Sequence, residues 1–252
     1  MLMKYLVFGD SHTIFFNITP AMRLLDSNLV GVQSVVKTIG GSTISGFGKR
    51  NSTLNTLAEY RKAYLEEKPD FIVFALGQVD LELGYYYRWF VKHQRPDDYF
   101  FVESLIDGLL EEVENIVDRY GLSPGQVVIK GVNLSVLTYD RRMAIRYVGG
   151  IVTENLTDKC AVDEAKKRIL ELFPSNLERN NVHLLFNSLL RERAHLCGFK
   201  YFDINDEIVD AGTSKVALRF ISAKFDHHIV DSLEVRLIHV KKLLETLYFG
   251  FK

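Results

Sequence analysis

The segment Tyr5-Leu6-Val7-Phe8-Gly9-Asp10-Ser11-His12 is the part of the sequence that indicates the type of fold most directly. Its first half is a run of four apolar residues, which is too short for a helix and is typical of a strand buried on both faces. The glycine that follows marks the end of the strand, because glycine often interrupts regular structure. The sequence therefore predicts a buried β-strand that leads directly into a loop carrying a carboxylate, a hydroxyl and an imidazole.

Four further segments have the same strand pattern, and helical segments separate them. The predicted strands cover residues 4–8, 30–39, 71–76, 126–132 and 200–204. Apolar residues with helical spacing predict helices at 53–67, 102–120, 162–173, 182–197 and 232–249. Strands that alternate with helices form a parallel sheet covered by helices. We therefore expect an α/β fold, a three-layer α/β/α sandwich with a central parallel sheet of flavodoxin-like order.

The chain is expected to form a single domain over residues 1–252. With 252 residues, 47% of them hydrophobic and 25% charged, it has ample apolar side chains for one large core. Residues 134–160 are longer than a usual strand-to-helix connection and contain Arg141, Arg142, Arg146 and the pair Gly149-Gly150. We expect this segment to be an insertion or a lid over one edge of the sheet.

The composition argues against several functional classes. The chain has 31 Lys and Arg and 32 Asp and Glu, which gives a formal charge of −1, so a nucleic-acid partner is not expected. Cys160 and Cys197 are far apart and match no zinc-binding spacing, which favours a reducing, cytoplasmic location. The sequence contains no run of apolar residues long enough for a membrane span, so none is expected. The apolar segment at the start is too short for the hydrophobic region of a signal peptide, so no signal peptide is expected either. Phosphate-loop and dinucleotide-binding glycine motifs are absent, which argues against nucleotide hydrolysis and nicotinamide chemistry. No cofactor is expected.

Polar residues gather where the predicted strands end, and ligands of open parallel sheets bind beyond the carboxyl ends of the strands. The four blocks are Gly9-Asp10-Ser11-His12, Gly40-Gly41-Ser42-Thr43, Gly77-Gln78-Val79-Asp80 and the C-terminal Asp226-His227-His228. Acyl transfer needs a hydroxyl beside a base, a carboxylate that orients the base, and donors for the oxyanion. Ser11, His228 and Asp226 are the predicted triad. The backbone amides of Ser11 and Gly41 are the predicted oxyanion donors.

These blocks, in this order, resemble those of the SGNH (GDSL-type) hydrolase superfamily, and the resemblance spans nearly the whole chain. It implies the flavodoxin-like SGNH hydrolase fold, Ser11 as nucleophile, Gly41 as oxyanion glycine and Asp226 with His228 as the C-terminal pair. The Gly-Asp-Ser-His form of the first block is similar to that of polysaccharide-modifying esterases and O-acyltransferases. The resemblance therefore implies serine-dependent ester hydrolysis or O-acyl (acetyl) transfer on a carbohydrate or polysaccharide-related substrate.

Two blocks depart from the family pattern. Val79 stands where the family usually has an asparagine whose amide donates to the oxyanion, and Gln78 is the predicted substitute donor. The C-terminal block is one residue shorter than the usual Asp-x-x-His, which leaves open whether His227 or His228 is the base; Asp231 is the alternative orienting carboxylate. These departures keep a second interpretation open, a catalytically weakened SGNH-fold protein that acts as a carbohydrate-binding or scaffold module.

The predicted substrate contacts are Asp10, His12, Asp80, His227 and Trp89. Trp89 belongs to an aromatic stretch, residues 85–90, on which a sugar ring can stack; core packing or an oligomer interface is the alternative, and the oligomeric state stays open. Ser11 has a structural alternative as a helix cap, and Gly40-Gly41 as a tight turn. No metal site is expected at the paired histidines, because adjacent side chains rarely face one cation.

Overall fold

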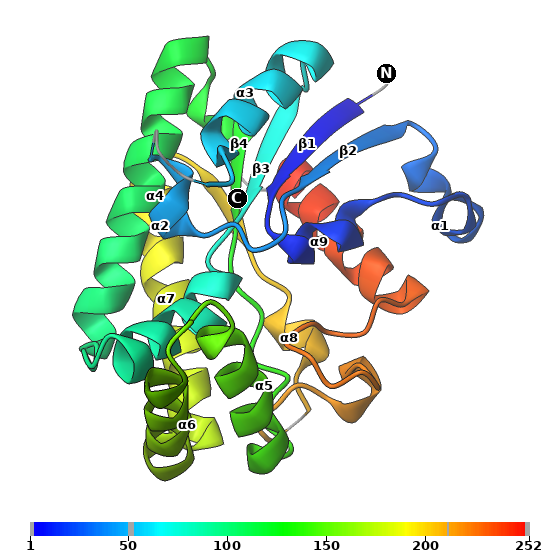
Figure 1. Ribbon diagram of the computed structural model, residues 1–252. Coiled ribbons are helices and arrows are strands. Elements are labelled where there is room, and N and C mark those ends of the chain that lie inside the picture. The colour runs from blue at the N-terminus through cyan, green and yellow to red at the C-terminus, as the bar shows by residue number, and fades with distance from the viewer. Residues whose placement is uncertain (1–2, 50–52, 211, 250–252) are drawn as a thin grey trace.

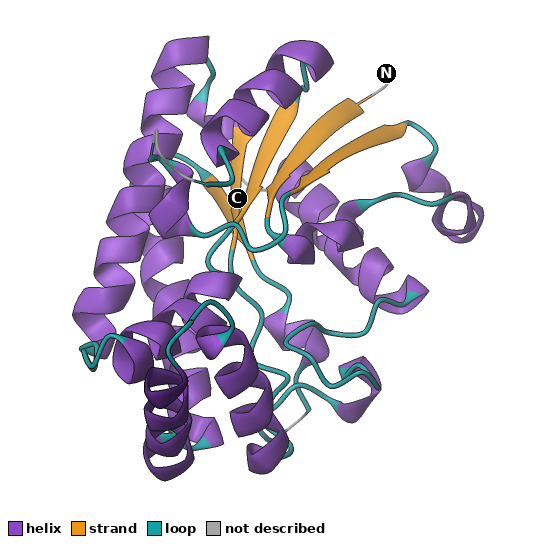
Figure 2. Cartoon of the chain, in the orientation of Figure 1, coloured by secondary structure: helices purple, strands orange, loops and turns teal. Residues whose placement is uncertain are grey.

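The computed structural model describes residues 3–49, 53–210 and 212–249, and they form a parallel sheet with helices on both faces (Figures 1 and 2). The five-stranded sheet has the order β2-β1-β3-β4-β5, which is the flavodoxin-like order that the sequence predicts. Each strand overlaps its predicted range. The strands are β1 (Met3–Gly9), β2 (Val32–Thr38), β3 (Phe71–Ala75), β4 (Val127–Lys130) and β5 (Lys200–Phe202).

Strand β1 is central and apolar on both sides, so its residues contribute to two separate cores. Leu6 and Phe8 belong to the core on one face of the sheet, and Tyr5 and Val7 belong to the core on the other. All four side chains are fully buried. This alternation explains why an unbroken apolar run forms a strand here, since successive side chains of a strand point to opposite faces.

Helices cover both faces of the sheet and continue beyond its carboxyl edge (Figure 1). The larger core includes residues of α3 (Thr56–Glu67), α4 (Asp98–Tyr120) and α7 (Asn176–Leu196). The opposite core includes residues of the 3₁₀ helix η1 (Ser11–Phe16), α1 (Pro20–Leu25) and α9 (Leu233–Phe249). The remaining elements are η2 (Ser27–Leu29), α2 (Ile44–Phe47), η3 (Asp80–Gly84), η4 (Tyr87–Val91), η5 (Pro124–Gln126), α5 (Arg141–Thr153), α6 (Lys159–Leu172), α8 (Asn205–Ile208) and η6 (Leu218–Phe220).

The predicted insertion or lid contains helix α5, which the sequence analysis did not anticipate. Asp140 caps the helix by accepting hydrogen bonds from the amides of Arg142 and Met143. The pair Gly149-Gly150 suggests a break, yet both glycines are helical. A Cβ on Gly149 would lie 3.6 Å from Ile169 Cδ1 of α6, an ordinary contact distance, so the packing of α5 on α6 does not require a glycine there. Whether the segment acts as a lid stays a prediction.

The register of the sheet brings the predicted blocks together. Gly9 pairs with Thr38 of β2 and with Ala75 of β3, so the loops that follow these three strands begin side by side. Gly9 also permits close approach to β3, because a Cβ there would lie 1.9 Å from the Ala75 carbonyl oxygen. Among the described helices, none is long and apolar enough to cross a lipid bilayer.

Candidate active site

Ser11 and His228 meet at the carboxyl edge of the sheet although they are 217 positions apart in the chain. The Ser11 Oγ lies 2.6 Å from His228 Nε2. Ser11 is the first residue of η1, directly after β1. The His228 loop is held by an antiparallel bridge between Ile221 and Ile229 and by a bond from the Val230 amide to the Phe220 carbonyl, 2.7 Å. A hydroxyl and an imidazole are therefore within proton-transfer distance.

Asp226 lies beside His228 but engages it in an unusual way. Its Oδ1 accepts a hydrogen bond from the His228 backbone amide at 2.8 Å, whereas His228 Nδ1 is 3.4 Å from the same oxygen. The shortened Asp-x-His spacing accounts for this, because an aspartate readily accepts from the amide two residues later. Asp231 instead accepts two bonds from Arg236, 2.6 and 2.8 Å long. Asp226 is thus the carboxylate that faces the imidazole.

The surroundings of His228 favour the neutral form of its imidazole. Burial lowers its pKa below the usual 6.5, the charge of nearby His12 lowers it further, and Asp226 opposes both effects. A neutral imidazole can accept the proton of Ser11, as a general base must.

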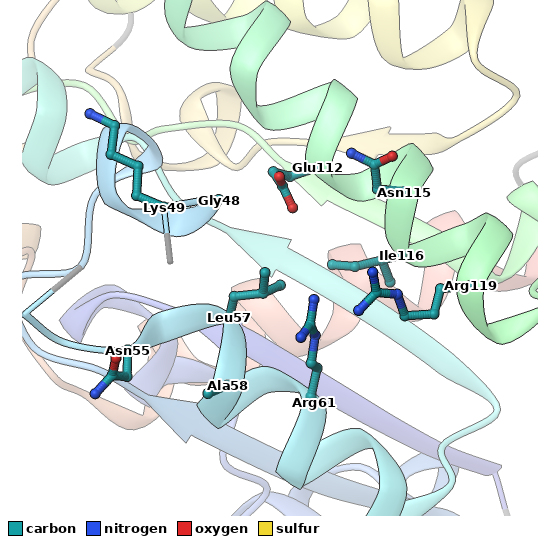
Figure 3. Close-up of a pocket in the computed structure, with 10 residues that line it drawn as sticks. All are labelled: Gly48, Lys49, Asn55, Leu57, Ala58, Arg61, Glu112, Asn115, Ile116 and Arg119. Carbon is teal, nitrogen blue, oxygen red and sulfur yellow. The ribbon is translucent and has the colours of Figure 1, made fainter. Parts of the chain in front are cut away.

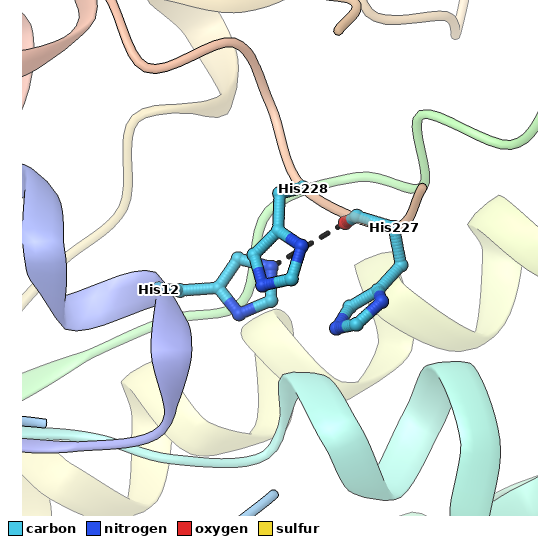
Figure 4. Close-up of side chains that lie close together, drawn as sticks. All are labelled: His12, His227 and His228. Atoms are coloured by element: carbon cyan, nitrogen blue, oxygen red, sulfur yellow. Dashed lines mark hydrogen bonds between the residues drawn. The ribbon is translucent and has the colours of Figure 1, made fainter. Parts of the chain in front are cut away.

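Asp10 and His12 form a second acid–imidazole pair next to Asp226 and His228. His12 Nδ1 and the His12 amide both lie 2.9 Å from Asp10 Oδ1, and the residues are 3% and 1% exposed. The His12 ring stacks on His228 with 4.4 Å between centroids and 20° between planes (Figure 4). The predicted substrate role of this pair stays a prediction, whereas its burial and stacking indicate support of the His228 ring.

His227 is oriented by Tyr147, a residue that no sequence motif indicates. Its Nδ1 lies 2.5 Å from the hydroxyl of Tyr147, which comes from α5. Burial lowers its pKa to about 2, so the ring is neutral. Its Nε2 is shielded from solvent and has no hydrogen-bond partner among the described residues. His228 is therefore the histidine placed to act as base. Tyr147 belongs to no sequence motif, and its helix α5 was not predicted, so its role could not be anticipated.

The three histidines are close enough to raise the question of a metal ion. Nitrogen atoms of His12, His227 and His228 all lie within 4.8 Å of one another (Figure 4). A metal needs imidazole lone pairs that converge on one point, and these lie in the ring planes. The nearly parallel, stacked rings of His12 and His228 do not converge in this way. The arrangement favours a hydrogen-bonding cluster over a metal centre.

Two backbone amides are available as oxyanion donors. Within the described part of the chain, neither the Ser11 nor the Gly41 amide donates a hydrogen bond. Gly41 lies in an exposed turn closed by a 3.1 Å bond from the Ser42 amide to the Ile39 carbonyl. Its φ of +73° is a conformation that favours glycine. The turn and the oxyanion role are compatible here, since the turn leaves the Gly41 amide unpaired.

Gln78 and Asp80, from the block after β3, mainly position other loops. The Gln78 amide exchanges two hydrogen bonds with the Asn133 backbone, 2.8 and 3.1 Å long, which leaves one N–H for the predicted oxyanion role. The Asp80 carboxylate accepts from the Ile44 amide at 2.8 Å and from Ser45. Burial raises its pKa to about 6. Asp80 thus holds the start of α2, just after the Gly41 turn, and its predicted substrate contact stays a prediction.

Trp89 lies in the core, which is the alternative that the sequence left open for it. Its side chain is 7% exposed and stacks on Phe90. The Arg95 guanidinium lies 4.6 Å from the ring centroid and occupies part of its face. The surroundings therefore do not support the predicted sugar-stacking role.

Two buried residues near the site, Lys130 and Asn187, were not predicted from the sequence to have a role there. Lys130, 3% exposed at the end of β4, donates to the Gly131 carbonyl and to Asn133 Oδ1. Burial lowers its pKa to about 8, while the Asp10 charge opposes that shift. Asn187 of α7 makes two 2.8 Å bonds with the Val132 backbone. A lysine at the end of an apolar strand is the signal that marks this region.

Comparisons with known proteins identify the fold. No protein-family model and no curated protein sequence matches the chain. It resembles a catalytic mutant of an acetylxylan esterase from Geobacillus stearothermophilus, with 13% identity, 98% of this chain and 94% of that chain covered, and a TM-score of 0.55. A carbohydrate acetylesterase family member from Sinorhizobium meliloti has 13% identity, covers 99% and 100%, and has a TM-score of 0.51.

A GDSL-like lipase from Bacteroides thetaiotaomicron is also similar, with 10% identity, 98% and 89% coverage and a TM-score of 0.51. At such identities the likeness concerns the fold. The chain has the SGNH hydrolase fold over nearly its whole length, as the resemblance of its four blocks predicts.

Proposed function

We propose that this chain is a serine esterase that cleaves acyl, in particular acetyl, esters of a carbohydrate. The observation that carries the proposal is the 2.6 Å approach of Ser11 Oγ to His228 Nε2 at the carboxyl edge of the sheet. A hydroxyl, a neutral imidazole and a carboxylate in one place match the requirements of nucleophilic acyl transfer. The esterases and lipase that share the fold support the same reaction class.

The proposed reaction has two steps. Ser11 Oγ attacks the ester carbonyl while its proton moves to His228 Nε2, and the amides of Ser11 and Gly41 donate to the oxyanion. The tetrahedral intermediate expels the alcohol, which receives the proton from His228, and the acyl group stays on Ser11. Water then attacks the acyl-enzyme, again deprotonated by His228, and releases the acid. Asp226 stabilises the imidazolium in both steps through its 3.4 Å contact.

The preference for a carbohydrate ester is supported by the site and by its structural neighbours. Two of those neighbours are named as an acetylxylan esterase and a carbohydrate acetylesterase. In this chain the buried, unpartnered Nε2 of His227 adjoins His228. Leaving a buried polar atom without a partner costs about 1–3 kcal/mol, and a substrate hydroxyl would satisfy it. If a sugar hydroxyl replaces water in the second step, the same residues perform O-acyl transfer.

Burst kinetics with p-nitrophenyl acetate and acetylated xylo-oligosaccharides test the proposal. We expect a burst of p-nitrophenol in the native protein, no burst in Ser11→Ala, and an unchanged burst in Ser214→Ala, whose side chain lies in an exposed turn. Acetate that appears in step with p-nitrophenol indicates hydrolysis, whereas acetylated sugar formed at its expense indicates transfer. A folded native protein with the same background rate as Ser11→Ala contradicts the esterase and favours the binding module.

A further inference from the structure

A polar cavity lies between α2, α3 and α4, and none of the proposed catalytic residues lines it (Figure 3). Its volume is about 460 Å³, within the range of about 300–1,000 Å³ that small-molecule sites occupy. Leu57 and Ile116 provide an apolar wall. The guanidinium groups of Arg61 and Arg119 point toward each other across the cavity, and the Glu112 carboxylate faces the same space (Figure 3). The cavity therefore combines two guanidinium groups, one carboxylate and an apolar surface, and Lys49 lies at its border.

Among the described residues neither arginine has a protein partner; Arg61 is half-buried and Arg119 is exposed. Within the described residues, neither Arg61 nor Arg119 has a carboxylate within 4.0 Å, and neither makes a hydrogen bond. Residues outside the described ranges contribute no Asp or Glu side chain. The Nε of Arg61 is shielded from solvent and has no acceptor among the described atoms. Because like charges repel and enclosed donors usually have acceptors, this arrangement indicates a site for an anion.

We propose that this cavity binds a phosphorylated, hydroxylated small molecule of the sugar phosphate class. A phosphate dianion matches the charge of two guanidinium groups, and its three free oxygens can accept from both, since arginine binds phosphate through paired N–H donors. A bare anion would be repelled by Glu112, whereas a ligand hydroxyl donates to that carboxylate. The carbon skeleton of the ligand lies against Leu57 and Ile116.

The test is a set of calorimetric titrations with glucose 6-phosphate, inorganic phosphate and glucuronate, backed by ³¹P NMR. We expect glucose 6-phosphate to bind more tightly than inorganic phosphate, which lacks the hydroxyls, and than glucuronate, which is a carboxylate. Arg61→Gln and Arg119→Gln each remove charge-assisted hydrogen bonds and should weaken binding about 10-fold or more. Lys62→Gln is the control, because it removes the same charge from an exposed neighbour on α3.

Glu112→Gln separates the two parts of the proposal. Without the carboxylate, inorganic phosphate should bind more tightly and the preference for the sugar phosphate should shrink. Ser11→Ala should leave all affinities unchanged, so the result is independent of the proposed esterase activity. The proposal is overturned if the native protein shows no saturable binding of any of the three probes. It is also overturned if the two arginine variants, checked by thermal unfolding to be folded, bind as the native protein does.

Discussion

Replacing Asp226 with asparagine tests how much the unusual acid–base contact contributes to catalysis. The asparagine Oδ1 can still accept the 2.8 Å bond from the His228 amide, so the loop should keep its shape while the negative charge is removed. His228 Nδ1 lies 3.4 Å from Asp226 Oδ1, which is longer than the 2.7–3.2 Å of ordinary N–H···O bonds. The carboxylate is therefore expected to contribute less than in a triad with a short contact.

The expected loss follows from this geometry. A hydrogen bond to a charged group contributes about 1.5–3 kcal/mol, and this corresponds to a loss of about 10–150-fold in kcat/KM. Where the carboxylate fully engages the histidine, its replacement costs about 10⁴-fold. Because Asp226 raises the pKa of His228, its removal should also move the acid limb of the pH profile to lower pH. Both effects are measured with p-nitrophenyl acetate between pH 4 and pH 9.

Asp231→Asn is the matched control, because that carboxylate pairs with Arg236 and not with the imidazole. It should change kcat/KM little. A loss of about 10⁴-fold in Asp226→Asn, equal to that of His228→Ala, would contradict this expectation and show that the contact shortens in the working enzyme. No loss at all would show a Ser–His dyad in which Asp226 only shapes the loop.

Three further substitutions probe the groups around the triad. His12→Gln removes a charge that lowers the pKa of His228, so the acid limb of kcat/KM should move to higher pH; a shift to lower pH contradicts this. The raised pKa of Asp80, about 6 against the usual 3.8, means that the folded state loses stability as pH rises between these values. In Asp80→Asn this pH dependence of the free energy of unfolding, about 3 kcal/mol between pH 4 and pH 7, should disappear when measured by urea unfolding. The same pH dependence in both proteins would contradict the raised pKa of Asp80. Tyr147→Phe breaks the bond to His227 and should raise KM about 2–10-fold for acetylated sugars but not for the aryl ester.

The sheet could be predicted from the sequence because its central strands are buried on both faces. Runs such as Tyr5–Phe8 and Phe71–Ala75 are short, apolar and followed by polar loops, and each property is local to the chain. Helix α5 escaped prediction for the opposite reason. Gly149-Gly150 disfavours a helix locally, and the helix is stabilised by burial of Ala144, Val148 and Val152 in the core, which is a tertiary effect.

The residue types of the active site were also visible in the sequence, whereas their partners were not. Ser11, Asp226 and His228 follow predicted strand ends or stand in a recognisable block, so their chemistry could be anticipated. The contact between Tyr147 and His227 depends on how α5 packs against the rest of the chain. The role of Asp80 likewise depends on where α2 begins.

The class of fold and the set of chemical groups follow from the order of the amino acids, because strand burial and block order are properties of neighbouring residues. Tertiary structure alone decided which histidine meets Ser11, how far Asp226 stands from the imidazole, and that Asp10 and Trp89 are buried. It also placed Arg61 opposite Arg119, 58 positions apart by their residue numbers. Hydrogen bonding and charge interactions change over fractions of an ångström, and such distances between remote residues are defined only when the chain has packed.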